Sequence, residues 1–256
     1  MYIGVREKYK VIRLLGKGAF AEVYLVEDRV GRIYACKMCE RAEMLEREAG
    51  FQKGITHPLF PGFFDFWHEE DRGCILMEYV PGKSLEYILR REGTFREEKA
   101  AEIGVWIAEG LGYLHEREEP LVFRDVKPSN VILMPEGGVK LLDFGCACPP
   151  GKSADRAGTP GFGAPEQFEP GAIQRAAADV YGLGRTLQEM TGEKCRGLLR
   201  KIADKCTAIY PEERLPNMRE TAELLRLCTG QRQGRMSTRQ RAVLRGEIRV
   251  VKDIIV

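Results

Sequence analysis

The residue pattern changes at Pro81-Gly82, and this change predicts a chain built in two parts. Before it, short runs rich in β-branched and aromatic residues alternate with glycine-containing turns, which favours strands. One charged segment rich in helix formers, 40–53, favours a single helix among these strands. After Pro81-Gly82, apolar residues recur at helical spacing over longer segments, which favours helices.

We therefore expect an α+β protein with a cleft between two lobes. The first lobe, 1–80, is expected to hold a five-stranded antiparallel sheet and one helix, and the second lobe, 81–228, to be mostly helical. The segment 229–256 is treated as a separate basic tail. The predicted strands are 11–15, 22–26, 32–38, 63–67 and 74–80, and the first helices of the second lobe are 84–91 and 96–116.

The composition argues against several classes of protein. The 256 residues carry 40 Lys and Arg against 38 Asp and Glu, and a net charge of only +2 argues against nucleic-acid binding over a broad surface. No apolar run reaches the ~18 residues of a membrane span, and charges at 6–8 stand where a signal peptide has its apolar stretch. We expect a cytoplasmic protein, or the cytoplasmic part of a longer membrane-associated one.

The chain has eight cysteines, which raises the alternatives of a disulfide framework or a metal site. The spacing Cys146-Ala147-Cys148 is not the C-x-x-C of zinc or redox motifs, and the whole chain has only three histidines. We favour reduced, structural thiols and predict no metal site made of Cys and His.

A glycine-rich turn, 16–23, joins the first two predicted strands. An ordinary hairpin explains such a turn; alternatively, its glycines let backbone N–H groups approach phosphate oxygens. It leads into a strand, so it is neither a Walker loop nor a dinucleotide fingerprint. Lys37 is either a solvated surface lysine or a group that returns beneath this turn to meet phosphates. In the second case Glu48 is the expected anionic partner and Glu46 the alternative.

The strongest cluster of chemically active residue types runs from 122 to 145. Asp125, Asn130 and Asp143 supply the carboxylate and amide oxygens that Mg²⁺ prefers beside phosphates. A positioned carboxylate can accept the proton of an attacking hydroxyl, and Lys127 can neutralise charge on a transferring group. A solvated loop with Asp and Asn in turns is the plainer alternative, but the joint pattern favours phosphoryl transfer.

These motifs, in this order, resemble the eukaryotic-type (Hanks-type) protein Ser/Thr kinase family over residues 9–228. The texture is closest to the bacterial members of that family. The resemblance implies a bilobal protein-kinase-like fold and a protein serine/threonine kinase. It also implies the cofactors ATP and Mg²⁺, protein substrates with Ser or Thr acceptors, and no nucleic-acid partner.

The resemblance implies a role for individual residues. The catalytic and metal-binding set is Asp125 as base, Lys127 beside the γ-phosphoryl group, Lys37 at the phosphates, Glu48 paired with Lys37, and Asn130 and Asp143 on Mg²⁺. The nucleotide-binding set is Gly16, Lys17, Gly18, Val23, Ala35, Lys37, Met77, Glu78, Val80 and Asn130, with Met77 as gatekeeper before the hinge residues 78–80.

Further downstream, 158–166 resembles the peptide-positioning loop of the family, with Thr159 positioning the substrate. By the same likeness Asp179 braces the catalytic loop, and Arg214 pairs with Glu166. If this pair is buried, we expect it to be structural.

The chain departs from the family pattern at three places. Ala21 stands for the usual third glycine, and Phe123 stands for a histidine at what is mostly a packing position. Gln52 lies one helical turn after Glu48 and is polar, whereas the family packs an apolar side chain at this position. This difference affects how readily the predicted helix 40–53 docks inward.

Regulation gives two further hypotheses. Ser153 is the candidate phosphorylation site, with Arg124 as the type of residue that binds such a phosphate; constitutive activity is the alternative. The tail 229–256 has a net charge of +5 and apolar residues at helical spacing, namely Leu244, Ile248, Val251 and Ile255. It predicts an amphipathic helix for a membrane surface or a partner, against the alternative of a solvated face.

Two other function classes compete with an active protein kinase. A pseudokinase scaffold would bind nucleotide and signal by conformation. A small-molecule kinase of the same fold would not need the extended peptide platform that 158–166 resembles.

Overall fold

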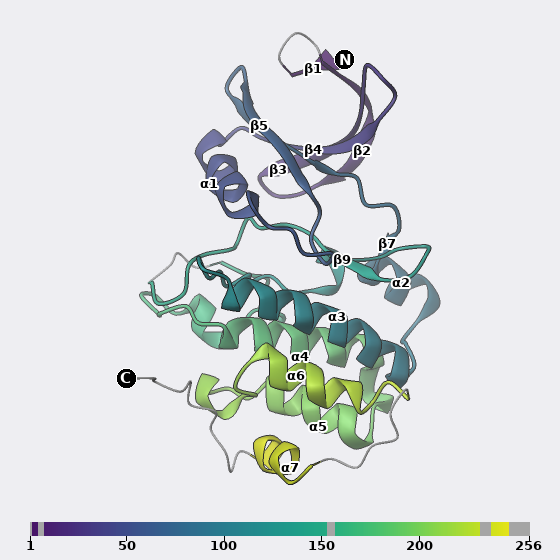
Figure 1. Ribbon diagram of the computed structural model, residues 1–256, viewed down its shortest axis with the longest axis vertical. Coiled ribbons are helices and arrows are strands. Elements are labelled where there is room, and N and C mark those ends of the chain that lie inside the picture. The colour runs from purple at the N-terminus through teal and green to yellow at the C-terminus, as the bar shows by residue number, and fades with distance from the viewer. Residues whose placement is uncertain (1, 5–7, 153–156, 231–236, 246–256) are drawn as a thin grey trace.

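The computed structural model describes residues 2–4, 8–152, 157–230 and 237–245. A twisted β-sheet forms one end of the molecule, and a bundle of helices forms the other, with short strands between them (Figure 1). The protein is therefore bilobal and α+β, as expected from the change in pattern at Pro81-Gly82.

The first lobe is one six-stranded sheet within the described residues, in the order β1-β2-β3-β4-β6-β5, with every neighbour antiparallel. All five expected strands are present. The prediction of five was one short because the two-residue β1 has no sequence pattern of its own. The elements are β1 (Tyr2–Ile3), β2 (Tyr9–Lys17), β3 (Ala21–Asp28), β4 (Ile33–Cys39), α1 (Ala42–Gln52), β5 (Phe63–Glu69) and β6 (Arg72–Glu78).

The two faces of this sheet bury different residues because side chains alternate along each strand. One face carries a cluster that includes Val26, Cys36 and Cys74, all fully buried. The other face packs against α1, where Leu45 and Ala49 meet Ile75 of β6. This second face therefore fixes the position of α1 over the sheet.

Gly82 forms part of the connection between the lobes and must be glycine. Its φ is +142°, and a Cβ there would overlap the carbonyl oxygen of Leu133. The first helix of the second lobe begins two residues later, where Ser84 is the N-cap. Its hydroxyl accepts a hydrogen bond from Tyr87 N at 3.1 Å.

The second lobe packs its helices around α3, whose residues Ile103, Ile107, Leu111 and Leu114 are fully buried. Its helices are α2 (Leu85–Glu92), α3 (Glu97–Glu116), α4 (Ala177–Thr191), α5 (Gly197–Cys206), α6 (Met218–Arg226) and α7 (Thr238–Arg245). Its strands and 3₁₀ turns are β7 (Lys83–Ser84), η1 (Pro128–Asn130), β8 (Val131–Leu133), β9 (Val139–Leu141), η2 (Pro165–Phe168), η3 (Gly192–Lys194) and η4 (Pro211–Glu213).

The helix α7 lies within the segment expected to be a tail, and it packs against the second lobe. Val243 is 2% exposed and joins the core of this lobe, with Leu244 against it. Arg239 Nη2 forms an ion pair with Glu220 Oε1 of α6 at 2.7 Å. The other apolar positions of the expected amphipathic helix, Ile248, Val251 and Ile255, lie outside the described residues.

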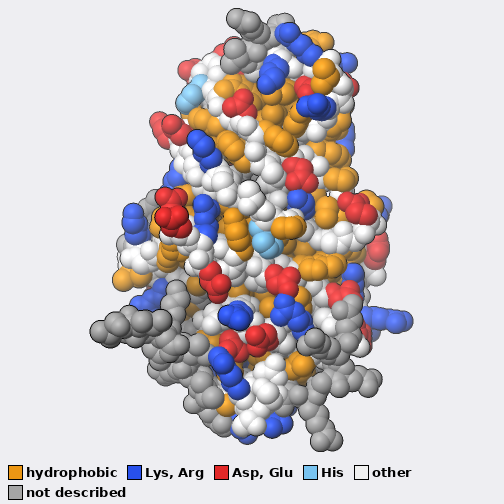
Figure 2. Space-filling model, in the orientation of Figure 1, with side chains coloured by type: hydrophobic (Ala, Val, Ile, Leu, Met, Phe, Trp, Pro, Cys, Tyr) orange, Lys and Arg blue, Asp and Glu red, His pale blue; other side chains and the backbone are white. Residues whose placement is uncertain are grey.

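The surface shows no single-sign charged patch on the face of Figure 2. Hydrophobic side chains gather over the sheet lobe there, while basic and acidic side chains intermix over the helices. Across the described residues, every helix is too short or too polar to cross a bilayer. All eight cysteines are free thiols.

Candidate active site

One face of the sheet carries half of the expected nucleotide-binding residues. Gly16 lies opposite Val23, and Val23 lies opposite Lys37. Ala35, two residues before Lys37 on β4, lies opposite Met77. Residues opposite one another in antiparallel strands share a face, as do residues two apart on one strand. The strands therefore bring these five residues onto the face that also packs on α1.

The glycine-rich turn is a hairpin with open space beside Gly16. Gly18 N donates a hydrogen bond to Ala21 O at 2.8 Å. A Cβ built on Gly16 meets no atom within 4 Å, so the fold itself does not require glycine there. A backbone that must admit phosphate oxygens closely does require it. Lys17 turns to solvent, where it pairs with Glu22 at 2.8 Å.

Lys37 links the two lobes through a cluster of charges in which Lys37 and Glu48 are buried and Asp143 is exposed. Its Nζ donates to both oxygens of Glu48, at 2.8 and 2.7 Å, and to Asp143 Oδ1 at 2.8 Å. Lys37 is 9% exposed and Glu48 is 3% exposed. The structure therefore brings the β4 lysine, the α1 glutamate and the Asp143 loop together as the sequence predicts, and Glu48 rather than Glu46 is the partner.

Burial and charge act against each other on the pKa values of this cluster. Burial opposes the charge on Lys37, but Glu48 and Asp143 outweigh it and raise the pKa of the lysine. Burial raises the pKa of Glu48 against the opposing effect of Lys37. Burial also acts upward on Asp143, but the charge and hydrogen bond of Lys37 outweigh it, so the pKa of Asp143 is lowered. Lys37 is thus held as a cation.

Gln52 supports this cluster instead of disturbing it. The side chain is 5% exposed, and its Nε2 donates to Glu48 Oε1 at 3.2 Å. A polar residue at this position is compatible with a docked α1 because it finds a buried acceptor on its own helix.

Phe123 acts as a packing residue, as expected. It is fully buried, and its ring lies 5.2 Å from that of Phe144, edge to face. Phe144 in turn lies 5.2 Å from Phe60, which follows α1 in the chain. The aromatic cluster joins the loop 122–130, the Asp143 loop and the segment after α1.

Asp125 is the centre of a hydrogen-bonded cluster in the loop 122–130. Its Oδ1 accepts from Thr159 Oγ1 at 2.7 Å, and its Oδ2 lies 2.8 Å from Lys127 Nζ. Lys127 Nζ also donates to Thr159 Oγ1 at 2.6 Å. Asn130 Nδ2 donates to Asp125 Oδ2 at 3.0 Å. Three residues that the sequence singled out therefore surround the carboxylate of the predicted base, namely Lys127, Asn130 and Thr159.

Asp179 holds the backbone of this loop from α4. Its fully buried carboxylate accepts from Phe123 N at 2.8 Å and from Arg124 N at 2.6 Å. His115 Nε2 lies 2.8 Å from the same carboxylate. Arg124 and Asp143 have φ values of +67° and +77°, a region that costs energy for residues other than glycine. The surrounding hydrogen bonds hold this strained backbone.

Asn130 and Asp143 offer oxygen atoms that suit a hard cation. Leu142 N donates to Asn130 O at 2.8 Å, which places Asn130 beside the residue before Asp143. The amide nitrogen of Asn130 is used by Asp125, so its oxygen remains as the acceptor. Asp143 Oδ1 accepts from Lys37 and Gly145, which leaves Oδ2. The donor chemistry fits Mg²⁺.

Glu166 and Arg214 form the expected pair in a buried setting. Arg214 donates from Nη1 to Glu166 Oε1 at 2.6 Å and from Nη2 to Glu166 Oε2 at 2.8 Å. Arg214 is 4% exposed.

Gln167, next to Glu166, donates to the carbonyl oxygens of Arg124 and Ala157, each at 2.8 Å. Arg124 itself donates from Nε to Cys146 O at 2.6 Å, and Ser153 lies outside the described residues.

The hinge has a side-chain brace that sequence reasoning missed. Lys140 Nζ of β9 binds Glu78 Oε2 at 2.8 Å and Phe60 O at 3.1 Å. Glu78 Oε2 also accepts from Gly62 N at 3.0 Å. The lysine therefore ties the end of β6, where Glu78 begins the hinge, to the second lobe. A lysine in the alternating run 139–141 gave no signal of this role.

Comparison with known proteins identifies the family of this chain. A family model described as protein kinase domain matches residues 9–223. The chain belongs to the protein kinase family. Among curated relatives, the kinase domain is 35% identical over 196 residues to the human (Homo sapiens) RAC-beta serine/threonine-protein kinase, covering 71% of this chain and 40% of that protein.

Two further curated relatives are also named as serine/threonine-protein kinases. This kinase chain is 34% identical to RAC-beta serine/threonine-protein kinase of Mus musculus and to RAC-beta serine/threonine-protein kinase A of Xenopus laevis, each over 196 residues. The match covers 40% of the length of each of these proteins.

Proposed function

We propose that this protein is a serine/threonine kinase that transfers the γ-phosphoryl group of ATP to Ser or Thr hydroxyls of protein substrates. The observation that carries the proposal is the arrangement at Asp125, whose two oxygens contact Thr159 and Lys127 while Asn130 lies on the same carboxylate. A base, a cation and a positioned hydroxyl within hydrogen-bonding reach are the elements that phosphoryl transfer to an alcohol needs.

The sheet face and the hinge supply the nucleotide site in this proposal. Val23, Ala35 and Met77 line the adenine end, next to the backbone of Glu78 and Val80. Gly16 and Gly18 leave space for phosphates, and Lys37 faces the space as a cation held by Glu48. Asn130 and Asp143 would hold Mg²⁺, which neutralises charge on the transferring group when bound.

In the transfer itself, Asp125 accepts the proton of the acceptor hydroxyl as that oxygen attacks the γ-phosphorus. The bond between this phosphorus and the β–γ bridging oxygen breaks, and ADP leaves with the bonding electron pair. Lys127 Nζ, 2.8 Å from Asp125, balances negative charge on the side of the incoming hydroxyl. Thr159 keeps both groups in register through its bonds to them. Asp179 holds the loop backbone so that this geometry needs no rearrangement.

A nucleotide-binding scaffold without transfer is the second candidate, and a small-molecule kinase is the third. The bonds from Thr159 to Asp125 and Lys127 favour a catalyst of peptide phosphorylation over both. They join the segment that resembles a peptide platform directly to the expected base.

Steady-state kinetics with Mg-ATP and a Ser/Thr peptide library test the proposal. Asp125→Asn keeps the size of the side chain and removes the base, and we expect a loss of about 10²–10⁴ in kcat with ATP binding retained. Glu212→Gln, an exposed change on η4, is the control and should act like wild type. Equal turnover by Asp125→Asn and wild type, or turnover of a small alcohol only, would contradict the proposal.

A further inference from the structure

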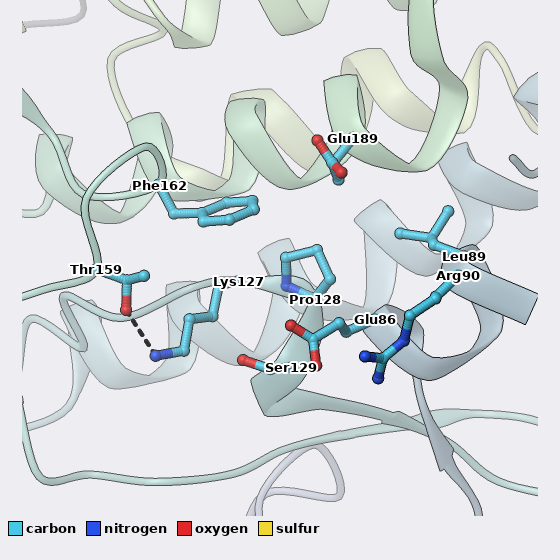
Figure 3. Close-up of a pocket in the computed structure, with 9 residues that line it drawn as sticks. All are labelled: Glu86, Leu89, Arg90, Lys127, Pro128, Ser129, Thr159, Phe162 and Glu189. Carbon is cyan, nitrogen blue, oxygen red and sulfur yellow. Dashed lines mark hydrogen bonds between the residues drawn. The ribbon is translucent and has the colours of Figure 1, made fainter. Parts of the chain in front are cut away.

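The pocket drawn in Figure 3, whose lining includes Lys127, Thr159, Glu86 and Glu189, belongs to the candidate active site. A second cleft, of about 470 Å³, shares none of these residues and lies where the end of α1 meets the segment that follows α3. We call it the Phe51–Arg117 cleft. Its lining residues are Gly50 and Phe51 of α1, Arg117, Glu119, Pro120 and Leu121 after α3, and Pro149 and Pro150 after the Asp143 loop.

The three segments that form the walls of this cleft are tied to one another. Val122 and Cys148 exchange backbone hydrogen bonds at 2.8 and 3.0 Å, which joins the two loop segments. Arg47 of α1 donates from Nη2 to Ala147 O at 3.3 Å, and its guanidinium carbon lies 5.4 Å from the centre of the Phe51 ring. The fold itself therefore holds the cleft in shape.

Most of the wall is apolar. Rings and methyl groups come from Phe51, Pro120, Leu121, Pro149 and Pro150. At about 30 Å³ for each water-sized group, the cleft has room for roughly 15 non-hydrogen atoms. Its volume also falls within the range of about 300–1,000 Å³ that is usual for small-molecule sites. The cleft therefore suits a small molecule with an apolar body.

Arg117 brings a positive charge to this apolar wall. Its Nη1 atom is buried and has no hydrogen-bond partner among the residues that the structure describes. A guanidinium nitrogen that is shielded from water and lacks an acceptor is unfavourable. An anion bound in the cleft beside the same guanidinium group offsets part of that cost.

The other charges near the cleft also favour an anion. Arg47 contacts the ring of Phe51 and a carbonyl oxygen, neither of which carries a charge that would cancel its own. Glu119 lines the cleft and opposes an anion, but it is exposed, so that water and salt screen its charge. The shielded charge of Arg117 is screened less and decides the sign of the ligand.

We propose that the Phe51–Arg117 cleft binds a small organic anion, with a carboxylate or phosphate group at Arg117 and an alkyl or aromatic body against Phe51 and Leu121. This inference does not depend on the proposed kinase activity, because none of the lining residues belongs to the catalytic, metal-binding or nucleotide-binding sets.

NMR titration of the protein with octanoate, octyl phosphate and octanol tests this proposal. These probes share an alkyl body and differ in the head group. Wild type should bind at least one of the two anions about tenfold more tightly than octanol, as for a hydrogen bond to a charged group, and the tighter anion identifies the head group. Arg117→Gln should remove this difference and leave the affinity for octanol unchanged. Lys53→Gln, which removes an exposed basic residue outside the lining, is the control and should bind like wild type.

A size series at Gly50 shows whether the probes occupy this cleft. A Cβ built on Gly50 meets no atom within 4 Å, so the fold accepts a larger side chain there. Gly50→Ala should keep the affinity for the anion, and Gly50→Leu should fill the space and abolish binding of all three probes. Thermal unfolding checks that both variants are folded. Equal affinity of wild type for the anions and octanol, no binding of either anion, or binding that survives Gly50→Leu overturns the proposal.

Discussion

Lys37 donates two hydrogen bonds to the two oxygens of Glu48, so a strand of the sheet and the helix α1 are joined by a bidentate ion pair. Asp143, from the second lobe, binds the same Nζ. The ammonium group of Lys37 can make all three hydrogen bonds only when α1, the sheet and the Asp143 loop are packed together. The ion pair of Lys37 with Glu48 is lost when Glu48 takes up a proton, and the one with Asp143 is lost when Asp143 does.

The two carboxylates should protonate in a fixed order as the pH falls. The pKa of Glu48 is raised above its ordinary 4.5 by burial, and the pKa of Asp143 is lowered below its ordinary 3.8 by Lys37. Glu48 therefore gains its proton first, and activity should begin to fall at a pH above 4.5. A pH profile of kcat/KM in wild type and Glu48→Gln checks this, because the variant should lack that acid limb. An identical acid limb in both proteins would show that another group controls it.

The pair of Glu166 and Arg214 should contribute to stability and not to chemistry. Arg214→Ala leaves a mostly buried carboxylate without its partner, and we expect unfolding free energy to fall by about 3–5 kcal/mol. Urea denaturation measures this. Arg219→Ala, which removes a side chain 80% exposed, should leave stability unchanged within error. Equal stability of the two variants would contradict a structural role.

The brace at the hinge predicts a selective effect on nucleotide binding. Lys140→Met removes the bonds to Glu78 and Phe60, which hold the start of the hinge against the second lobe. We expect KM for ATP to rise severalfold, KM for peptide to stay unchanged, and stability to fall by about 1–2 kcal/mol. Lys99→Met, at a half-buried ion pair on α3 away from the hinge, is the control. A rise in KM for peptide alone would disprove this role.

Cys146 should react slowly despite its place beside the Asp143 loop. Burial, with the charges of Asp125 and Asp143, raises the pKa of Cys146 to about 11. Compared with a thiol of ordinary pKa 9.0, about 100-fold less thiolate is then present at neutral pH. Mass spectrometry of iodoacetamide-treated protein over a range of pH measures the labelling rate. Labelling at the rate of a small free thiol near pH 7.5 would be inconsistent with this environment.

Much of the fold was accessible from the sequence because its signals are local. The strands β2 to β6 follow β-branched runs, and Ser84 marks the start of α2. The site residues Lys37, Asp125 and Asp143 stood in motifs whose order carries the information. Such motifs name the residues without needing the contacts between them.

What the sequence missed are contacts between distant positions. His115 binds Asp179, which is 64 residues away, and Lys140 binds Glu78, which is 62 residues away. His115 and Lys140 do not belong to any motif that the sequence analysis used. The burial of Val243 could not be predicted either, because helical spacing shows which residues share a face but not whether a partner covers it. Glu86 and Glu189 likewise line one pocket only because α2 and α4 pack beside the loop that holds Lys127.

The identity of the phosphorylated residue tests the account most directly. Wild type would be incubated with Mg-ATP and a protein or peptide mixture that contains Ser, Thr and Tyr, and each phosphorylated position would be assigned by mass spectrometry. The account predicts phosphoserine and phosphothreonine that disappear when Asp125→Asn replaces wild type. Phosphate on tyrosine only, or phosphoserine formed equally by Asp125→Asn, would contradict it.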